Sequence, residues 1–135
     1  MIKKVNHIAV VVPDLDASMH FWVEALGLEL SHKEYVASQA VEVAFLPVGD
    51  SKIELLQPTD NESGVARYLE RKGPGMHHIC FEVEDLEAAL TKLAKADVQL
   101  INELPVIGSD GRKFAFIHPK SANGVLVELY ELSGR

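Results

Sequence analysis

Four residues of this chain have the types and positions expected of metal ligands. His7 and His78 each lie near the start of an apolar stretch, in "VNHIAVV" and "MHHICFEV", and Glu54 and Glu128 interrupt the stretches "KIELL" and "VLVELY". A carboxylate in the middle of an apolar strand is costly to bury unless a cation meets it. No lysine or arginine is placed to meet both glutamates, whereas a divalent ion would do so. Two imidazoles and two carboxylates suit Co, Ni, Mn, Fe or Zn, with positions left open for water or substrate.

These four residues occupy matching positions of an internal repeat. Aligning Val5–Leu15 with Met76–Leu86 places His7 on His78 at an offset of 71 residues, and "AFLP" matches "AFIHP" at the same offset. The two glutamates are 74 residues apart, so the second half has three extra residues, near "KSANG". A single histidine or glutamate in a strand is usually structural or solvent-facing. Four at repeated positions favour one shared ligand set.

The apolar pattern predicts one β-α-β-β-β unit in each half. Asp14 and Asp85 follow the first strand of each half as helix N-cap candidates, and apolar residues then recur at helical spacing. Gly27 is expected to end the first helix, and Ser63 to cap a short helix between the halves. A single unit of this size could not bury both faces of its sheet. We therefore expect an α+β fold in which two tandem βαβββ modules form a curled eight-stranded sheet around a metal-binding cleft. It would be one domain spanning 1–135, with modules at about 1–58 and 76–135 and a helical connector at 59–75.

Strand alternation distinguishes the two adjacent histidines, His77 and His78. Side chains two residues apart in a strand share a face of the sheet. His77 alternates onto the face of bulky apolar residues that is expected to pack on a helix, whereas His78 shares its face with the small residue Cys80. His7 likewise shares its face with Ala9. We therefore expect His7 and His78 to face the cleft and His77 to face the other way.

The composition argues against several classes of function. The 135-residue chain has a net charge of −7, whereas general nucleic-acid binding needs a basic footprint. Its one cysteine, Cys80, cannot form an internal disulfide and fits a cytoplasmic location. The N-terminal apolar run is too short for a membrane span and lacks a cleavage signal. Neither nucleic acid nor a membrane is expected as a partner. Local basic clusters could still receive an anionic small molecule: Arg67, Arg71 and Lys72, or Arg112, Lys113 and Lys120.

The chain resembles a known family over nearly its full length. The resemblance rests on "NHIAVVVPDLDASMHFW", "VEVAFLPVGDSKIELLQP", "GMHHICFEVEDLEAAL" and "IHPKSANGVLVELYE". With these stretches the chain is similar to the vicinal oxygen chelate superfamily and, within it, to the methylmalonyl-CoA epimerases. The resemblance implies that His7, Glu54, His78 and Glu128 bind a divalent metal ion. It also implies Co(II) as the expected ion, with Ni, Mn, Zn or Mg as alternatives, methylmalonyl-CoA as the substrate, and a homodimer.

The resemblance further implies a reaction and two catalytic residues. Glu42, in "AVEVAFL", matches the carboxylate that the family uses as a proton-transfer base, and it shares its strand face with Ala44. (2R)- and (2S)-methylmalonyl-CoA would interconvert through an enolate, with a metal ion stabilising its charge as a Lewis acid. Glu42 and Glu128 would remove and return the proton at C2 from opposite sides.

Three other functions remain open on the same pattern. A glyoxalase I-type lactoylglutathione lyase would use the same four ligands, although the "HPKS" segment and Glu42 favour the epimerase. An Fe(II) dioxygenase needs two histidines and one carboxylate, so the second carboxylate, Glu54, argues against it. A binding module without metal would have no need of the four ligands.

Overall fold

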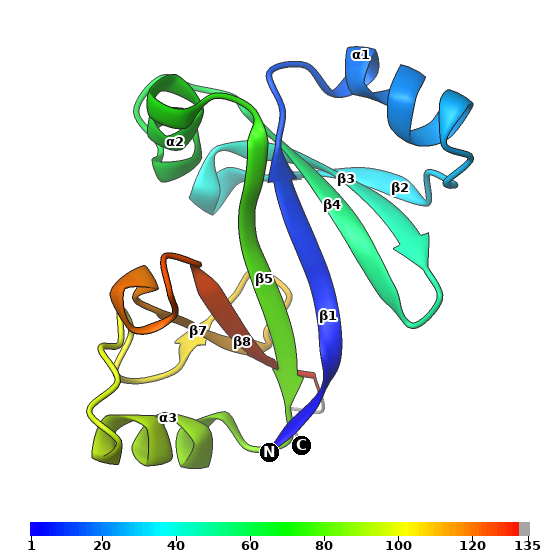
Figure 1. Cartoon of the computed structure of the whole chain (residues 1–135). Helices are drawn as coiled ribbons and strands as arrows, with labels where there is room; N and C mark the ends of the chain where they lie inside the picture. The colour runs from blue at the N-terminus through cyan, green and yellow to red at the C-terminus, as the bar shows by residue number, and fades with distance from the viewer. Residues whose placement is uncertain (133–135) are drawn as a thin grey trace. The chain divides into compact units, whose positions relative to one another are not determined.

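A computed structural model describes residues 1–132, and in it the β-α-β-β-β order occurs twice, as the sequence predicts (Figure 1). The first copy comprises β1 (Ile2–Val11), α1 (Leu15–Met19), the π-helical turn η1 (His20–Ala25), β2 (His32–Val36), the 3₁₀ turn η2 (Ala37–Gln39), β3 (Val41–Val48) and β4 (Ser51–Pro58). Helix α2 (Gly64–Lys72) follows. The second copy comprises β5 (Gly75–Val83), α3 (Leu86–Lys95), β6 (Val106–Ile107), β7 (Lys113–Ile117), the 3₁₀ turn η3 (Pro119–Ser121) and β8 (Val127–Glu131).

The chain divides into two compact units. The first unit is His7–His77, and the second unit joins Met1–Asn6 to the chain from His78 onward. Strand β1 therefore contributes to both units, and the connecting helix α2 belongs to the first. The strands are hydrogen-bonded in the order β2-β3-β4-β1-β5-β8-β7-β6 of one eight-stranded sheet. The predicted α+β fold of two βαβββ modules is thus confirmed.

The sheet of the first unit carries a separate apolar cluster on each face. One cluster packs against α1, and the face that carries it is called the α1 face. The other packs against α2, and its face is called the α2 face. The alternation predicted for β1 is confirmed, because Val10 and Val12 lie with the α1 cluster whereas Ala9 and Val11 lie with the α2 cluster. In β3 and β4, Ala44, Leu46 and Leu55 belong to the α1 face, and Val41, Val43 and Leu56 to the α2 face.

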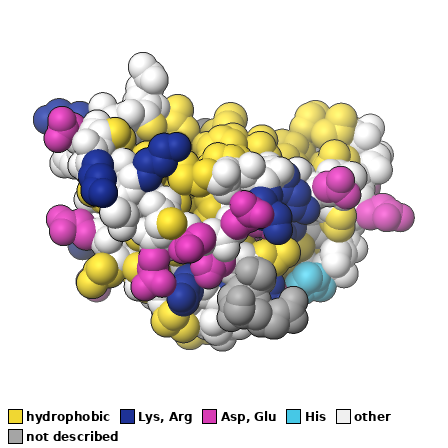
Figure 2. Space-filling view, turned by 90° about the horizontal axis from the view of Figure 1, so that it is seen from below, with side chains coloured by type: hydrophobic (Ala, Val, Ile, Leu, Met, Phe, Trp, Pro, Cys, Tyr) yellow, Lys and Arg dark blue, Asp and Glu magenta, His cyan; other side chains and the backbone are white. Residues whose placement is uncertain are grey.

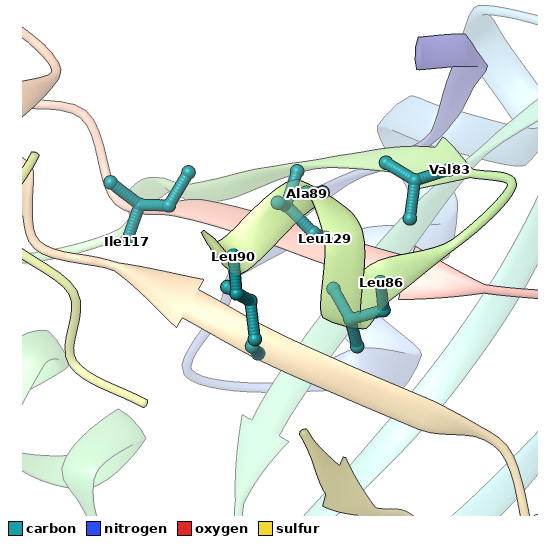
Figure 3. Close-up of a cluster of buried hydrophobic side chains, with 7 residues drawn as sticks. Val83, Leu86, Ala89, Leu90, Ile117 and Leu129 are labelled. Atoms are coloured by element: carbon teal, nitrogen blue, oxygen red, sulfur yellow. The ribbon is translucent and has the colours of Figure 1, made fainter. Parts of the chain in front are cut away.

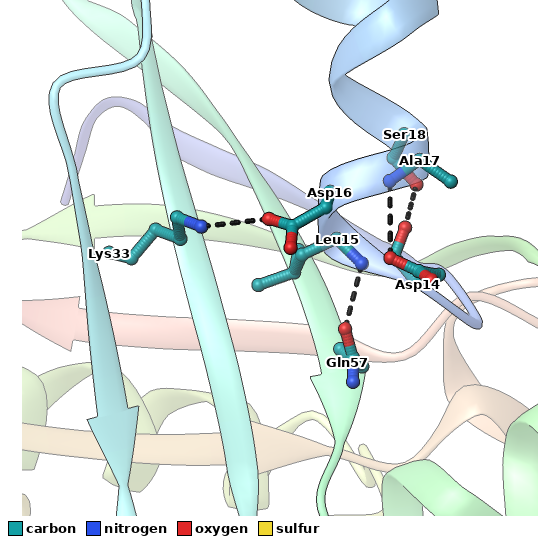
Figure 4. Close-up of polar contacts among 7 residues, drawn as sticks. All are labelled: Asp14, Leu15, Asp16, Ala17, Ser18, Lys33 and Gln57. Carbon is teal, nitrogen blue, oxygen red and sulfur yellow. Dashed lines mark hydrogen bonds and ion pairs between the residues drawn. The ribbon is translucent and has the colours of Figure 1, made fainter.

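Two side chains meet the backbone N–H groups at the start of α1 (Figure 4). Asp14 is the N-cap, as predicted, and its carboxylate accepts from the backbone N–H of Ala17 at 3.1 Å. The side chain of Gln57, on β4, accepts from the backbone N–H of Leu15 at 2.7 Å. The Gln57 contact joins the start of the helix to β4. The helical segment continues through η1 and ends at Gly27, which has φ +91°.

The second unit repeats this construction around α3 (Figure 3). Asp85 caps the helix through the N–H of Ala88, and Glu131 takes the place of Gln57 by accepting from the N–H of Leu86 at 3.2 Å. The face that packs on the helix is called the α3 face. Its buried side chains are Val83, Leu86, Ala89, Leu90, Ala115, Ile117 and Leu129. The opposite face, called the His78 face, carries His78, Cys80 and Glu82 from β5 and Glu128 and Tyr130 from β8.

The surface bears charges of both signs. Figure 2 shows acidic and basic side chains interspersed over one side of the molecule. Among residues 1–132 there is no helix with the length and hydropathy needed to cross a bilayer.

Candidate metal and active site

The predicted ligands form two His–Glu pairs, and the first lies in the first unit. Nδ1 of His7, on β1, is 3.2 Å from Oε2 of Glu54, on β4. The two strands are parallel neighbours in which Ala9 is opposite Glu54, so His7 and Glu54 both lie on the α2 face. Their side chains are only 10% and 13% exposed, so the pair is largely shielded from solvent.

The second pair lies on the His78 face of the second unit. Nε2 of His78 is 3.1 Å from Oε1 of Glu128, and the side chains are 9% and 13% exposed. Strands β5 and β8 are parallel, with Cys80 opposite Glu128. The ring of Phe116, on β7, packs edge-on against the His78 ring at a centroid distance of 5.6 Å. The two pairs therefore have matching strands, burial and spacing, as the repeat predicts.

The spacing within each pair suits two ligands of one metal ion. Metal–nitrogen and metal–oxygen bonds of about 2.0–2.2 Å that meet near a right angle place the two ligand atoms about 3 Å apart. The observed 3.1 and 3.2 Å match this value. A hydrogen-bonded imidazole and carboxylate have a similar separation. The donor set therefore fits a borderline divalent ion without selecting which one.

His77 makes different contacts from its neighbour His78. Its ring packs edge-on against Tyr68 of α2 at a centroid distance of 4.9 Å. The Tyr68 hydroxyl donates to the backbone carbonyl of Met76 at 2.5 Å, which holds the tyrosine in place. The packing role expected for His77 thus agrees with the structure, and His78 is the member of the "HH" pair that contacts a glutamate.

Glu42 does not lie on the face of the first unit that holds His7 and Glu54. In the register of β3 and β4, Phe45 is opposite Glu54 on the α2 face, whereas Glu42 is opposite Gln57 on the α1 face. Lys33, which pairs with Asp16 of α1 at 3.0 Å, also interacts electrostatically with Glu42. Glu42 thus shares its face with Ala44, as expected, and His7 lies on the other face; the catalytic role expected for Glu42 stays a prediction.

Ala44, two residues beyond Glu42, lies in the apolar cluster that packs against α1. The repeat counterpart of Glu42 is Lys113, 71 residues later, and it pairs with Glu87 of α3 at 3.7 Å. Both positions thus belong to helix-packed faces.

The second unit holds a buried carboxylate that the sequence pattern did not single out. Glu82 is 4% exposed and lies on the His78 face, two residues beyond Cys80. Its cross-strand partner Tyr130 donates its hydroxyl to Asp110 at 2.5 Å. Burial and that hydrogen bond raise the pKa of Tyr130 well above the usual range for a phenol. The sequence could have indicated that Glu82 lies on the face of His78, because Glu82 continues the alternation of His78 and Cys80 along β5.

Comparison with known proteins agrees with this architecture. Residues 6–116 match the Glyoxalase/Bleomycin resistance protein/Dioxygenase superfamily. The chain is 40% identical to the ethylmalonyl-CoA/methylmalonyl-CoA epimerase of Cereibacter sphaeroides, over 98% of this chain and 100% of that protein. It is 39% identical to the human mitochondrial methylmalonyl-CoA epimerase, over 93% of this chain and 72% of that protein.

A solved structure extends the similarity to three dimensions. A variant of the Streptomyces coelicolor methylmalonyl-CoA epimerase, in complex with 2-nitronate-propionyl-CoA, superposes with a TM-score of 0.88 at 33% identity. The match covers 98% of this chain and 96% of that chain. The chain therefore belongs to the glyoxalase/bleomycin resistance protein/dioxygenase superfamily and, within it, to the family of the methylmalonyl-CoA epimerases.

Proposed function

We propose that this protein is a metal-dependent epimerase that interconverts (2R)- and (2S)-methylmalonyl-CoA. The observation that carries the proposal is the pair of matched, buried His–Glu contacts in a chain of this family. Relatives named for methylmalonyl-CoA epimerase activity, and a related structure that binds a propionyl-CoA nitronate, support the substrate. The superfamily hosts several chemistries and a lactoylglutathione lyase would use the same four ligands, so the similarity to the named epimerases carries the choice of substrate.

In this proposal His7, Glu54, His78 and Glu128 together hold one divalent ion. The donor set of two imidazoles and two carboxylates fits such an ion, and binding would offset the burial of two glutamates within largely apolar strands. The ion would supply Lewis acidity toward the thioester oxygen, on which negative charge develops during the reaction. Co(II) is the ion we propose first, with Ni, Mn, Zn or Mg as alternatives.

The protein's own residues would move the proton. Carbon C2 lies between a thioester and a carboxylate. Removal of its hydrogen as a proton therefore leaves an enolate that is planar at C2. Inversion then needs a proton returned from the side opposite to the one from which it left. Glu128 is proposed for one of these roles, through its carboxylate oxygens on the His78 face. Glu42 is proposed for the other role, as the resemblance implies, although its strand position lies on the α1 face.

We further propose that the protein acts as a homodimer in the cytoplasm. The buried thiol of Cys80, the single cysteine of the chain, is compatible with a reducing compartment. The basic clusters of the sequence remain candidates for contacts with the phosphates of coenzyme A.

The proposal is tested by an epimerase assay on metal-stripped protein that is reloaded with each divalent ion in turn. We expect stripped protein to be inactive and Co(II) to restore interconversion of the two epimers. The hemithioacetal of glutathione and methylglyoxal serves as the control substrate. Turnover of the hemithioacetal alone would replace the proposal with a lactoylglutathione lyase, and full activity of the stripped protein would remove the metal from it.

A further inference from the structure

We propose that Asn123–Gly124 is a site of spontaneous covalent modification, at which the backbone nitrogen of Gly124 displaces the side-chain amide of Asn123. The site lies in the connection between β7 and β8. It does not depend on the proposed epimerase reaction. The inference rests on the sequence of the two residues, the exposure of the amide, and the hydrogen bonds of the turn that holds them.

Asn123 presents an accessible amide next to an unhindered nitrogen. The residue is exposed, and its side chain makes no hydrogen bond within the part of the chain that the structure describes. Gly124 has no Cβ to shield the attacking nitrogen. Asparagine is one of the thermally labile residues of proteins. The two neighbours therefore combine an exposed leaving group with a nucleophile that nothing crowds.

The other asparagines of the chain are less suited to this reaction. Asn6 is followed by histidine and is only 7% exposed, and Asn61 and Asn102 are each followed by glutamate. The side-chain oxygen of Asn102 also accepts from the backbone N–H of Phe116 at 2.8 Å, which holds that amide in place. A bulky following side chain hinders approach of its own nitrogen. The reaction should therefore be selective for Asn123.

The turn restrains the attacking nitrogen in the folded protein. The N–H of Gly124 donates to the carbonyl of Pro119 at 2.8 Å, and Asn123 has a left-handed backbone with φ +55°. A nitrogen held by that carbonyl must be released before it can approach the preceding side chain. Exposed connections open at a much lower cost in free energy than the whole fold. Attack should therefore follow local opening of the turn, and it should be slower than in the unfolded chain.

Ser121 sets how easily this turn opens. Its hydroxyl accepts from the backbone N–H of Gln99 at 2.8 Å, and the carbonyl of Gln99 accepts from the N–H of His118 at 2.9 Å. These two bonds attach η3 to the segment between α3 and β6. Loss of the Ser121 hydroxyl should therefore increase the fraction of molecules in which the turn is open.

The reaction is balanced with water as the only co-reactant. The nitrogen of Gly124 forms a bond to the side-chain carbonyl carbon of Asn123, the carbon–nitrogen bond of the amide breaks, and ammonia leaves with the proton of that nitrogen. Water then opens the cyclic imide at either carbonyl, which gives aspartate or isoaspartate. Isoaspartate routes the backbone through the side chain and lengthens it by one methylene group.

The lengthened backbone should weaken the start of β8. Val125 donates its N–H to the carbonyl of Ala122 at 3.0 Å, and the carbonyl of Leu126 accepts from the N–H of Ile79 on β5 at 3.2 Å. An extra methylene at position 123 displaces these groups from their partners. The converted protein should therefore be less stable than Asn123→Asp, which adds the same charge without lengthening the chain.

The test is incubation of the whole folded protein at mildly alkaline pH, followed by peptide mapping with mass spectrometry. Loss of the amide is followed at Asn61, Asn102 and Asn123, and the same protein in denaturant gives the unrestrained rates. Ser121→Ala tests the control by the turn. Asn123→Gly, which tolerates the left-handed backbone and has no amide, is the matched control. Thermal midpoints are measured for the converted protein and for Asn123→Asp.

We expect conversion in the folded protein at Asn123, faster than at Asn61 or Asn102 and slower than at Asn123 in denaturant. Ser121→Ala should speed it by about 2- to 10-fold in the folded protein, which corresponds to the loss of one hydrogen bond, and should leave the rate in denaturant unchanged. Asn123→Gly should release no ammonia from this turn. The converted protein should melt below Asn123→Asp.

Two results would overturn the proposal. One is the absence of conversion at Asn123 in the folded protein, and the other is conversion at equal rates at all three asparagines. An unchanged rate in folded Ser121→Ala would overturn the control by the turn. Equal thermal midpoints of the converted protein and Asn123→Asp would overturn the predicted effect on β8.

Discussion

The separation of the two adjacent histidines leads to a quantitative prediction about metal-dependent stability. His78 contacts Glu128, whereas His77 packs on Tyr68. Replacing His78 by alanine should therefore remove a proposed metal ligand, whereas replacing His77 by alanine should remove its packing on Tyr68. Because each variant also changes the stability of the metal-free protein, the informative quantity is the shift in thermal midpoint on adding metal, not the midpoint itself.

The size of that shift follows from binding linkage. An ion that binds only the folded chain, supplied at 100 times its dissociation constant, stabilises the fold by about 2.7 kcal/mol. For a domain of this length 1 kcal/mol corresponds to about 3 °C, so the unmodified protein should shift by about 8 °C. Loss of one ligand should weaken binding at least about 100-fold, since even outer-shell changes reach that size. The remaining stabilisation is then about 0.4 kcal/mol, or about 1 °C.

The assay is a thermal melt with and without Co(II) at one fixed concentration, chosen from the affinity of the unmodified protein. We expect a shift of about 8 °C for His77→Ala and about 1 °C for His78→Ala, with His7→Ala behaving like His78→Ala. The matched control is His77→Ala, which makes the same histidine-to-alanine change at the neighbouring position of β5. A full metal shift in His78→Ala, or its disappearance in His77→Ala alone, would refute the assignment of faces in β5.

Three further predictions concern single side chains. Glu42→Gln should keep its metal content but lose about 10²- to 10⁴-fold in kcat, and turnover close to that of the unmodified enzyme would remove Glu42 from the mechanism. Glu131→Ala leaves the backbone N–H of Leu86, the first of α3, without its side-chain acceptor, so the free energy of unfolding should fall by about 1–3 kcal/mol in a denaturant titration. Glu131→Gln places a glutamine where the first unit has Gln57, so its free energy of unfolding should fall by less than about 1 kcal/mol. Tyr130 should ionise above the usual phenol pKa of about 10, so its contribution to stability is present below that pH and is lost as the pH rises through its raised folded-state pKa. Absorbance titration at alkaline pH should show one late-titrating tyrosine, and Tyr130→Phe should abolish that step; an unchanged titration curve would exclude the contact with Asp110.

The sequence by itself determined the repeated architecture and the pairing of the proposed ligands. Both follow from local periodicity: alternation assigns His7 and His78 to one side of their strands, and the offsets of 71 and 74 residues relate the two halves. The N-caps Asp14, Asp85 and Ser63 were also predictable, because capping depends on a side chain and the next few N–H groups.

Only the tertiary structure decided which face of β3 packs on α1. Alternation shows that Glu42 and Ala44 share a face, but the identity of that face depends on the register with β4 and on where α1 packs. Likewise, the burial of Glu82 and its ion pair with Lys3 depend on strands that are far apart in the chain. A strand pattern repeats every two residues, so it does not show which side of the strand a distant helix covers. That choice is made by packing between segments far apart in the chain.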